Sequence, residues 1–227
     1  MKTMRTTTTT RTTTITAAIL FAVIMFFSAT VFSSNYEEVM TANIQKLNNE
    51  FTTSGLTSLA NQFERIANAE PGKWQPRYYA AYCYVWATAI AEMDADEKHK
   101  LIDLAQIQMD ILQKSFKNES EIFALQAFAY QMRITDMSKG FKYSSLASEA
   151  LEEAEKLNPK NPRVYYIRGN NILHTPKAFG GGKQKAKPLF EKASGLFESQ
   201  KPANAIEPSW GSEHNKQMLA LCNAVDE

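Results

Sequence analysis

The sequence predicts an all-α protein, an α-solenoid in which antiparallel helix pairs are stacked. From residue 35 onward, apolar residues recur at steps of three and four, which is typical of amphipathic helices. The alternation of apolar and polar residues that indicates half-buried strands is missing from the sequence. Short segments with proline or glycine separate the helical stretches. These observations predict about nine helices joined by short turns, with the C-terminal helix as a cap.

Four helices are expected in the N-terminal half. Pro76 suits the first turn of an aromatic-rich helix, because a proline there lacks an amide hydrogen that would need a partner. Asp94 or Asp96 suits a helix start, since its carboxylate accepts hydrogen bonds from free amides. The expected elements are a helix over residues 36–50, a second from Leu56 that ends at Pro71-Gly72, a third over residues 76–93, and a fourth that follows the aspartate cap.

Five helices are expected in the C-terminal half, where glycines and prolines mark the turns. Gly140 is expected to separate the first two of them. The expected elements cover residues 119–136, a segment that ends at Leu157, residues 162–174, residues 183–199, and a last helix that begins at Ser209 or Ser212 and ends near Ala224.

A repeat relates three successive helix pairs, with steps of 44 and 42 residues between Tyr79, Phe123 and Tyr165. The first helices share a large-small-large pattern, and the second helices share a pattern of small and large apolar residues. The aligned sets are Tyr79, Cys83 and Trp86; Phe123, Ala127 and Tyr130; Tyr165, Gly169 and Ile172; then Ala105, Met109 and Leu112; Ala147, Leu151 and Ala154; Ala186, Phe190 and Ala193. One pair cannot bury its apolar face alone, so stacking supplies the core. Cys83 and Gly169 are therefore predicted to be packing positions.

The repeat resembles the tetratricopeptide repeat (TPR), and the best match is Ala147, Leu151, Ala154 and Pro159. The resemblance covers about residues 55–200 and implies a TPR-like helical-repeat domain over residues 34–227. The chain as a whole is similar to exported repeat proteins of some Gram-negative bacteria. The strict repeat is about 34 residues long. The longer steps here predict longer helices or longer connections.

The N-terminus is typical of a secretory signal peptide over residues 1–33. Three basic residues and no acid precede and flank the apolar run Ile15–Phe27, and small residues around Ser33 provide a cleavage site. This apolar run is shorter than the roughly 20 residues that a membrane span needs. The sequence therefore predicts an exported protein, periplasmic or secreted, with an uncleaved single-pass N-terminal anchor as the alternative. Membrane contact is expected only through such an uncleaved segment.

Composition argues against several classes of function. The chain has 25 basic and 24 acidic residues, and three of the basic ones lie in residues 1–33, so the remainder is slightly acidic and offers no reason to expect nucleic-acid binding. His99, His174 and His214 lack metal-ligand spacing, so neither a metal nor a cofactor is expected. Cys83 and Cys222 are interpreted as unpaired side chains, although a bridge is possible in an exported protein. No set of acid, base and nucleophile converges, which favours a non-enzymatic protein.

The TPR resemblance implies a binding groove lined by the first helix of each pair. Carried onto this chain, the groove residues are Arg77, Tyr84, Glu121, Phe128, Arg163, Tyr166, Asn170 and His174. Arginines beside aromatic rings suit a peptide, including its terminal carboxylate. The competing interpretation is that Tyr84 and Phe128 pack against the terminal helix under Trp210.

A second candidate site is the glycine turn before residues 183–199. Amides of Gly180, Gly181 and Gly182, with Lys183 beside them, are predicted to hold a small organic anion. The alternative is that these glycines only permit a tight turn. The sequence thus leaves two hypotheses: an exported repeat protein whose concave groove binds a protein or peptide partner, or a periplasmic carrier or transport accessory protein for a small organic anion.

Overall fold

The computed structural model describes residues 36–224, and the chain divides into two compact units at residues 42 and 43. The predicted signal peptide, residues 1–33, lies outside the described residues, so its presence and cleavage stay predictions. A helix over residues 36–47 crosses the boundary between the units. In the described ranges, no helix combines the length and the apolar character needed to cross a membrane.

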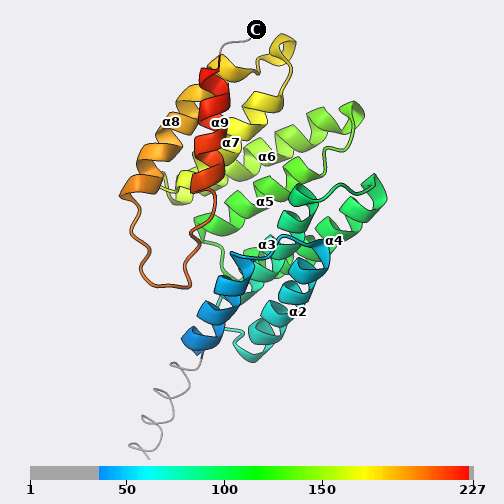
Figure 1. Cartoon of the computed structure of the whole chain (residues 1–227), viewed down its shortest axis with the longest axis vertical. Coiled ribbons are helices and arrows are strands. Elements are labelled where there is room, and N and C mark those ends of the chain that lie inside the picture. Colours follow the sequence, from blue (N-terminus) through cyan, green and yellow to red (C-terminus); the bar gives the residue numbers. More distant parts are fainter. Residues whose placement is uncertain (1–35, 225–227) are drawn as a thin grey trace, which may run out of the picture. The chain divides into compact units, whose positions relative to one another are not determined.

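Every regular element of the second unit up to residue 224 is a helix (Figure 1). Its elements are α2 (Thr53–Ala69), α3 (Gln75–Ile90), α4 (Ala95–Ser115), α5 (Ser120–Met132), α6 (Met137–Leu157), α7 (Pro162–His174), the 3-10 helix η1 (Lys177–Phe179), α8 (Lys183–Ser199) and α9 (Ser212–Asn223). Between residues 36 and 224 there is no strand. The predicted all-α class is confirmed.

The helices of the second unit are stacked as pairs. α3 packs on α4, α5 on α6, and α7 on α8, while α3, α5 and α7 also contact one another in that order. We call these three the inner helices. α9 packs on α8 and closes the series, as predicted for a C-terminal cap. The result is the stacked-pair solenoid that the repeat predicts.

The aligned repeat positions form the core between the helices. All nine aligned residues of α4, α6 and α8 have an exposed fraction of 0%, and Cys83 is equally buried. A Cβ atom on Gly169 would lie 2.6 Å from Cε1 of Phe190. Only glycine lets α7 and α8 approach this closely without a shift of that ring. Cys83 and Gly169 are confirmed as packing positions.

The extra length of each repeat lies in its second helix. α4 and α6 contain 21 residues each and α8 contains 17, whereas α5 and α7 contain 13. We call α4, α6 and α8 the outer helices. Their length accounts for the repeat steps of more than 40 residues.

The prediction that Gly140 separates two helices is wrong. α5 ends at Met132, and α6 already begins at Met137, so that Gly140 lies inside its first turn. The carboxylate of Asp136 caps this start by accepting hydrogen bonds from the amides of Ser138 (2.9 Å) and Lys139 (3.3 Å). Such a cap contributes about 1 kcal/mol, which offsets the cost of about 1 kcal/mol for a glycine inside a helix.

Candidate functional site

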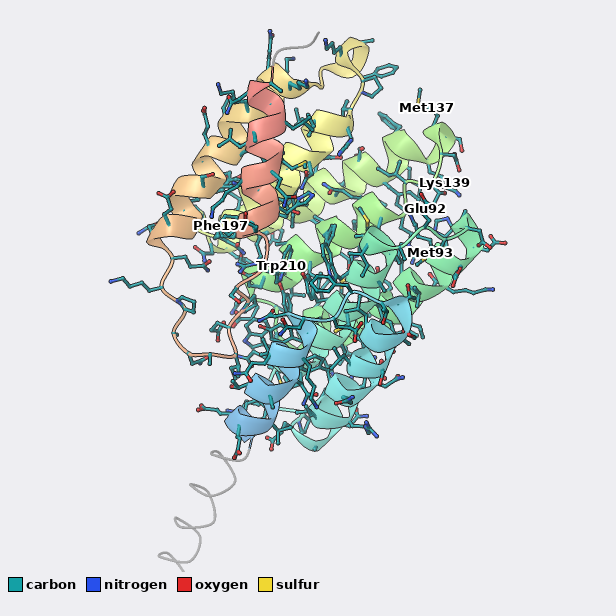
Figure 2. All side chains as sticks on the ribbon, in the orientation of Figure 1. Glu92, Met93, Met137, Lys139, Phe197 and Trp210 are labelled. Atoms are coloured by element: carbon teal, nitrogen blue, oxygen red, sulfur yellow. The ribbon has the colours of Figure 1, made fainter. Side chains whose placement is uncertain are left out.

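The segment between α8 and α9 returns to the inner helices and places Trp210 against them (Figure 2). Gly211, directly before α9, has a positive φ of 102°, which favours glycine. A Cβ atom there would lie 3.2 Å from Cζ of Phe197 and 3.5 Å from Cδ1 of Tyr166. This glycine therefore allows the chain to reverse directly after Trp210 while staying in contact with α7 and α8.

Trp210 joins rings from three inner helices into one group. Its ring stacks on Tyr82 (centroids 4.8 Å apart, 28°) and on Phe128 (5.8 Å, 27°), and Tyr166 meets it edge-on (6.3 Å, 76°). On α3, Tyr82 stacks in turn on Trp86 (6.2 Å, 6°). We call these five side chains the aromatic array. Each such ring pair contributes about 0.5–1.5 kcal/mol beyond the burial of its area.

Burial differs within the aromatic array. The exposed fractions of Tyr82, Phe128 and Tyr166 are 7%, 7% and 3%. Trp86 and Trp210 are only half-buried. The two indoles therefore still present ring surface to solvent beside a base of buried rings.

Polar side chains of α3, α5 and α7 bind Trp210 and the segment before it. The indole Nε1 donates a hydrogen bond to the hydroxyl of Tyr78 (2.9 Å), and that hydroxyl donates to Glu121 (3.3 Å). Arg163 forms an ion pair with Glu121 (3.0 Å) and donates to the backbone carbonyl of Pro208. We call Tyr78, Glu121 and Arg163 the polar latch, because they tie the 200–211 segment to α3, α5 and α7.

The polar latch carries buried charge. The Arg163 side chain has an exposed fraction of 0%, and its guanidinium lies 5.2 Å from the centre of the Trp210 ring. Burial raises the pKa of Glu121, whereas the charge of Arg163 acts to lower it. Since removal of one member of a buried pair leaves the other charge uncompensated, the two side chains depend on each other.

One histidine borders the aromatic array. The Nδ1 atom of His214 lies 2.8 Å from the hydroxyl of Tyr166, with the rings in edge-on contact. Burial, and secondly the nearby His174, lower the pKa of His214, so the imidazole is neutral at pH 7. Asn170 lies beside the same tyrosine hydroxyl, and His174 is exposed at the end of α7.

The structure brings together six of the eight predicted groove residues. Glu121 and Arg163 belong to the polar latch, Phe128 and Tyr166 to the aromatic array, and Asn170 and His174 lie along α7 beside His214. Arg163 and Tyr166 are buried beneath Pro208 and Trp210. A partner that reaches them would have to displace this segment. Their role in binding stays a prediction.

Arg77 and Tyr84 point elsewhere. Arg77 donates to Asn68 and Gln108, and Tyr84 donates to Glu64 of α2 (2.9 Å). The inner face of α3 therefore differs from the one that the TPR resemblance implies for Arg77 and Tyr84. Tyr78 and Tyr82 occupy the inner face instead. The alternative in which a ring packs under Trp210 holds for Phe128, whereas Tyr84 is engaged with α2.

The sequence contained a signal for the missed residues. Residues 78–86 hold more large rings than one packing face needs, and the surplus consists of rings that face Trp210 or α2. Periodicity alone could not divide neighbouring tyrosines between two faces.

The glycine turn is engaged in backbone hydrogen bonds. The amides of Gly180, Gly181 and Gly182 donate to the carbonyls of Lys177 (3.0 Å), Pro176 (3.2 Å) and Ile172 (2.9 Å) respectively. These amides are therefore not available to an anion in this conformation. Gly180 and Gly182 have positive φ values of 89° and 105°, and a Cβ atom on Gly181 would overlap the Thr175 carbonyl. The geometry favours the tight-turn interpretation. Of the predicted anion site, the three glycine amides are already engaged, so only the Lys183 side chain is left as a candidate.

The cysteines and histidines offer little further chemistry. Cys83 and Cys222 are both free thiols, and burial raises the pKa of Cys83 well above its ordinary value. Among residues 36–224 there is no group of three or more histidine, cysteine, aspartate or glutamate side chains arranged to hold a metal ion.

A comparison with solved structures identifies a similar protein. The HusA haemophore from Porphyromonas gingivalis superposes with a TM-score of 0.75 and 31% sequence identity, over 82% of this chain and 92% of that chain. The chain belongs to the HusA haemophore family. No family model and no curated protein matches the sequence.

A second solved structure shares the fold alone. A thermophilic TPR protein from Thermus thermophilus superposes with a TM-score of 0.59 and 17% identity, over 82% of this chain and 80% of that chain. The TPR-like architecture inferred from the repeat is confirmed for this member of the haemophore family.

Proposed function

We propose that this chain is an exported, non-enzymatic haem-binding protein that carries haem outside the cell. The observation that carries the proposal is the 31% identity to the HusA haemophore, which extends over 92% of that protein. The signal-peptide pattern of residues 1–33 supports export. Haem is a flat aromatic ring with two carboxylates, so this function belongs to the class of organic-anion carriers that the sequence leaves open.

The aromatic array supports a flat ligand on the inner helices. Buried rings of Tyr82, Phe128 and Tyr166 give it a rigid base, and the half-buried rings of Trp86 and Trp210 retain exposed surface. Ring systems gain from offset stacking or edge-on contact with such surfaces. We therefore assign the haem ring to the side of the array that Trp86 and Trp210 expose, with the haem carboxylates directed to solvent.

A titration tests this assignment. Haemin is added to the purified protein, and binding is followed through the Soret band. We expect saturable binding that weakens about tenfold in Trp210→Ala, because one stacked ring pair and its apolar contact are lost. Phe179→Ser serves as the matched control, since that ring is 80% exposed on η1 and should leave the affinity unchanged.

The proposal is wrong if haemin produces no saturable change in the wild-type protein. The assignment to the aromatic array is wrong if Trp210→Ala binds haemin as tightly as the wild type. Circular dichroism of each variant separates a loss of binding from a loss of fold.

A second candidate is a peptide partner on the same helices. One observation favours it: the segment of this chain that contains Pro208 and Trp210 already lies across the inner helices and is held through a backbone carbonyl. A synthetic peptide that copies residues 203–211 tests the idea. If this face accepts peptides, the copy should bind more tightly to Trp210→Ala, in which the internal segment is loosened, than to the wild-type protein. Equal or absent binding rejects this candidate.

A further inference from the structure

Two neighbouring turns of the solenoid are strongly basic. Residues 136–142, at the start of α6, and residues 177–191, at the start of α8, together contain six lysines and two acidic residues. The chain after residue 33 is slightly acidic, so this concentration of positive charge is local. Lys142, Lys177 and Lys185 are exposed, while Lys139 and Lys187 form ion pairs with the two acids.

The same two turns carry the most exposed large apolar side chains of the second unit. The exposed fractions are 84% for Met137, 90% for Phe141 and 80% for Phe179. Single apolar residues on a surface are common, but rings exposed to this degree on two adjacent turns indicate an interaction site.

Both turns lie at the same end of the helix pairs (Figure 1). α6 and α7 run antiparallel, and Ser144 on α6 donates a hydrogen bond to Asn171 near the end of α7 (3.1 Å). Phe141 lies one helical turn before Ser144 on the same face, so it stands beside the end of α7. η1, with Phe179, follows that end directly. We call Met137, Phe141, Phe179 and the lysines around them the basic edge.

The basic edge has a boundary at the preceding turn. The α3–α4 connection carries Glu92 and Asp94, and Nζ of Lys139 lies 3.2 Å from Nε2 of His99 near the start of α4, the helix that follows this connection. The sign of the charge therefore changes from one turn to the next. The excess of positive charge lies at the starts of α6 and α8.

We propose that the basic edge docks on an anionic lipid surface, with Met137, Phe141 and Phe179 inserted among the lipids and the lysines against their headgroups. Side chains that are 80–90% exposed do not form the hollow that a small ligand needs. A flat apolar layer with an anionic surface can instead receive all three side chains and the lysines at once. This site uses none of the residues of the aromatic array and is independent of haem binding.

The test is co-sedimentation of the exported protein with lipid vesicles. One set of vesicles contains phosphatidylcholine alone, and the other an equal mixture of phosphatidylcholine and phosphatidylglycerol. We expect binding to the mixed vesicles only, and a loss of that binding at high salt. Each lysine beside an anionic surface contributes about a fivefold factor in affinity.

Two sets of variants locate the contact. Phe141→Ser with Phe179→Ser should weaken binding to the mixed vesicles at least about tenfold. Replacement of the exposed lysines of the basic edge by glutamine should have a larger effect; these changes are Lys142→Gln, Lys177→Gln and Lys185→Gln. The matched controls, Phe51→Ser and the set Lys114→Gln, Lys117→Gln and Lys160→Gln, remove exposed residues elsewhere and should leave binding unchanged.

The proposal is overturned if the wild-type protein does not bind the mixed vesicles or binds the neutral vesicles equally. It is also overturned if the edge variants and the control variants bind the mixed vesicles with the same affinity. Haemin titration of the edge variants keeps the two sites apart, since we expect them to bind haemin normally. Failure of vesicle binding with normal haemin binding rejects the basic edge alone.

Discussion

The outer and inner helices of this solenoid differ in how strictly they repeat. In the outer helices α4, α6 and α8, equivalent positions hold the same kind of residue, as at Ala105, Ala147 and Ala186. In the inner helices, the equivalent positions Arg77, Glu121 and Arg163 hold charges of different sign, and only the last two form an ion pair with each other. Repetition on the outside fixes the stacking of the pairs. Because the residues vary on the inner helices, the repeat does not predict this surface. The 200–211 segment is bound there.

The largest expected effect comes from breaking the polar latch. Arg163→Met leaves the Glu121 carboxylate without its buried partner, and we expect the free energy of unfolding to fall by about 3–5 kcal/mol. Urea unfolding measures it. Addition of Glu121→Gln to the same chain removes the unpaired charge and should restore most of the loss. If the double variant is no more stable than the single one, the pair does not act as a unit.

A smaller effect is expected from the repeated frame. Gly169→Ala places a Cβ atom against the Phe190 ring, and we expect a destabilisation of about 1–3 kcal/mol, with the haemin affinity of the folded protein unchanged. Gly195→Ala is the matched control, because a Cβ atom there would meet no atom within 4 Å. This exposed helical glycine should give a gain of up to about 1 kcal/mol. Equal effects at both positions would contradict the close contact of α7 and α8.

The smallest expected effect is a dependence on pH at the border of the aromatic array. Burial lowers the pKa of His214 below 6.5, so the unfolded chain binds this proton at a higher pH than the folded chain does. The contribution of neutral His214 to the free energy of unfolding should therefore be fully present above about pH 6.5. It should decrease as the pH falls below that value. His214→Gln should remove this part of the dependence in urea unfolding at two pH values.

His99 provides the comparison for that experiment. Its pKa is lowered as well, by burial and by Lys139 and Arg133, so it adds its own part to the loss of stability in acid. His99→Gln should remove the contribution of His99 to the loss of stability in acid and leave the contribution of His214 unchanged. An unchanged acid response in His214→Gln would mean that the imidazole is not buried against Tyr166 as described.

Most of the fold could be predicted from the sequence, because the signals are local and repeated. The spacing of Ala147, Leu151 and Ala154 predicts a buried helical face, and the bounds of α7 and α8 agree with the prediction. The sequence does not predict the start of α6, because the cap by Asp136 outweighs a glycine that usually interrupts helices. A single strong cap can decide an element where composition suggests a break.

The candidate site could be predicted only in part. The TPR resemblance places Phe128, Arg163 and Tyr166 on the inner surface. On α3, the run of neighbouring rings gives no periodic signal that separates the face of Tyr78 and Tyr82 from the face of Tyr84. Trp210 reaches the inner helices from more than 40 residues away in sequence, and no local pattern encodes that contact. The glycine turn is open to two interpretations in the sequence, because the hydrogen bonds of its amides to the carbonyls of Pro176 and Lys177 at the 3-10 turn and of Ile172 in α7 have no sequence signal.

Haem binding on the inner helices is tested most directly by the position of bound haem relative to the indoles. Of the three tryptophans, Trp86 and Trp210 belong to the aromatic array, and their indole N–H signals can be assigned in NMR spectra from Trp→Phe variants. We predict that paramagnetic ferric haem broadens both signals while the amide signals of residues 137–141 stay sharp. Broadening at residues 137–141 with both indole signals unaffected would contradict haem binding on the inner helices.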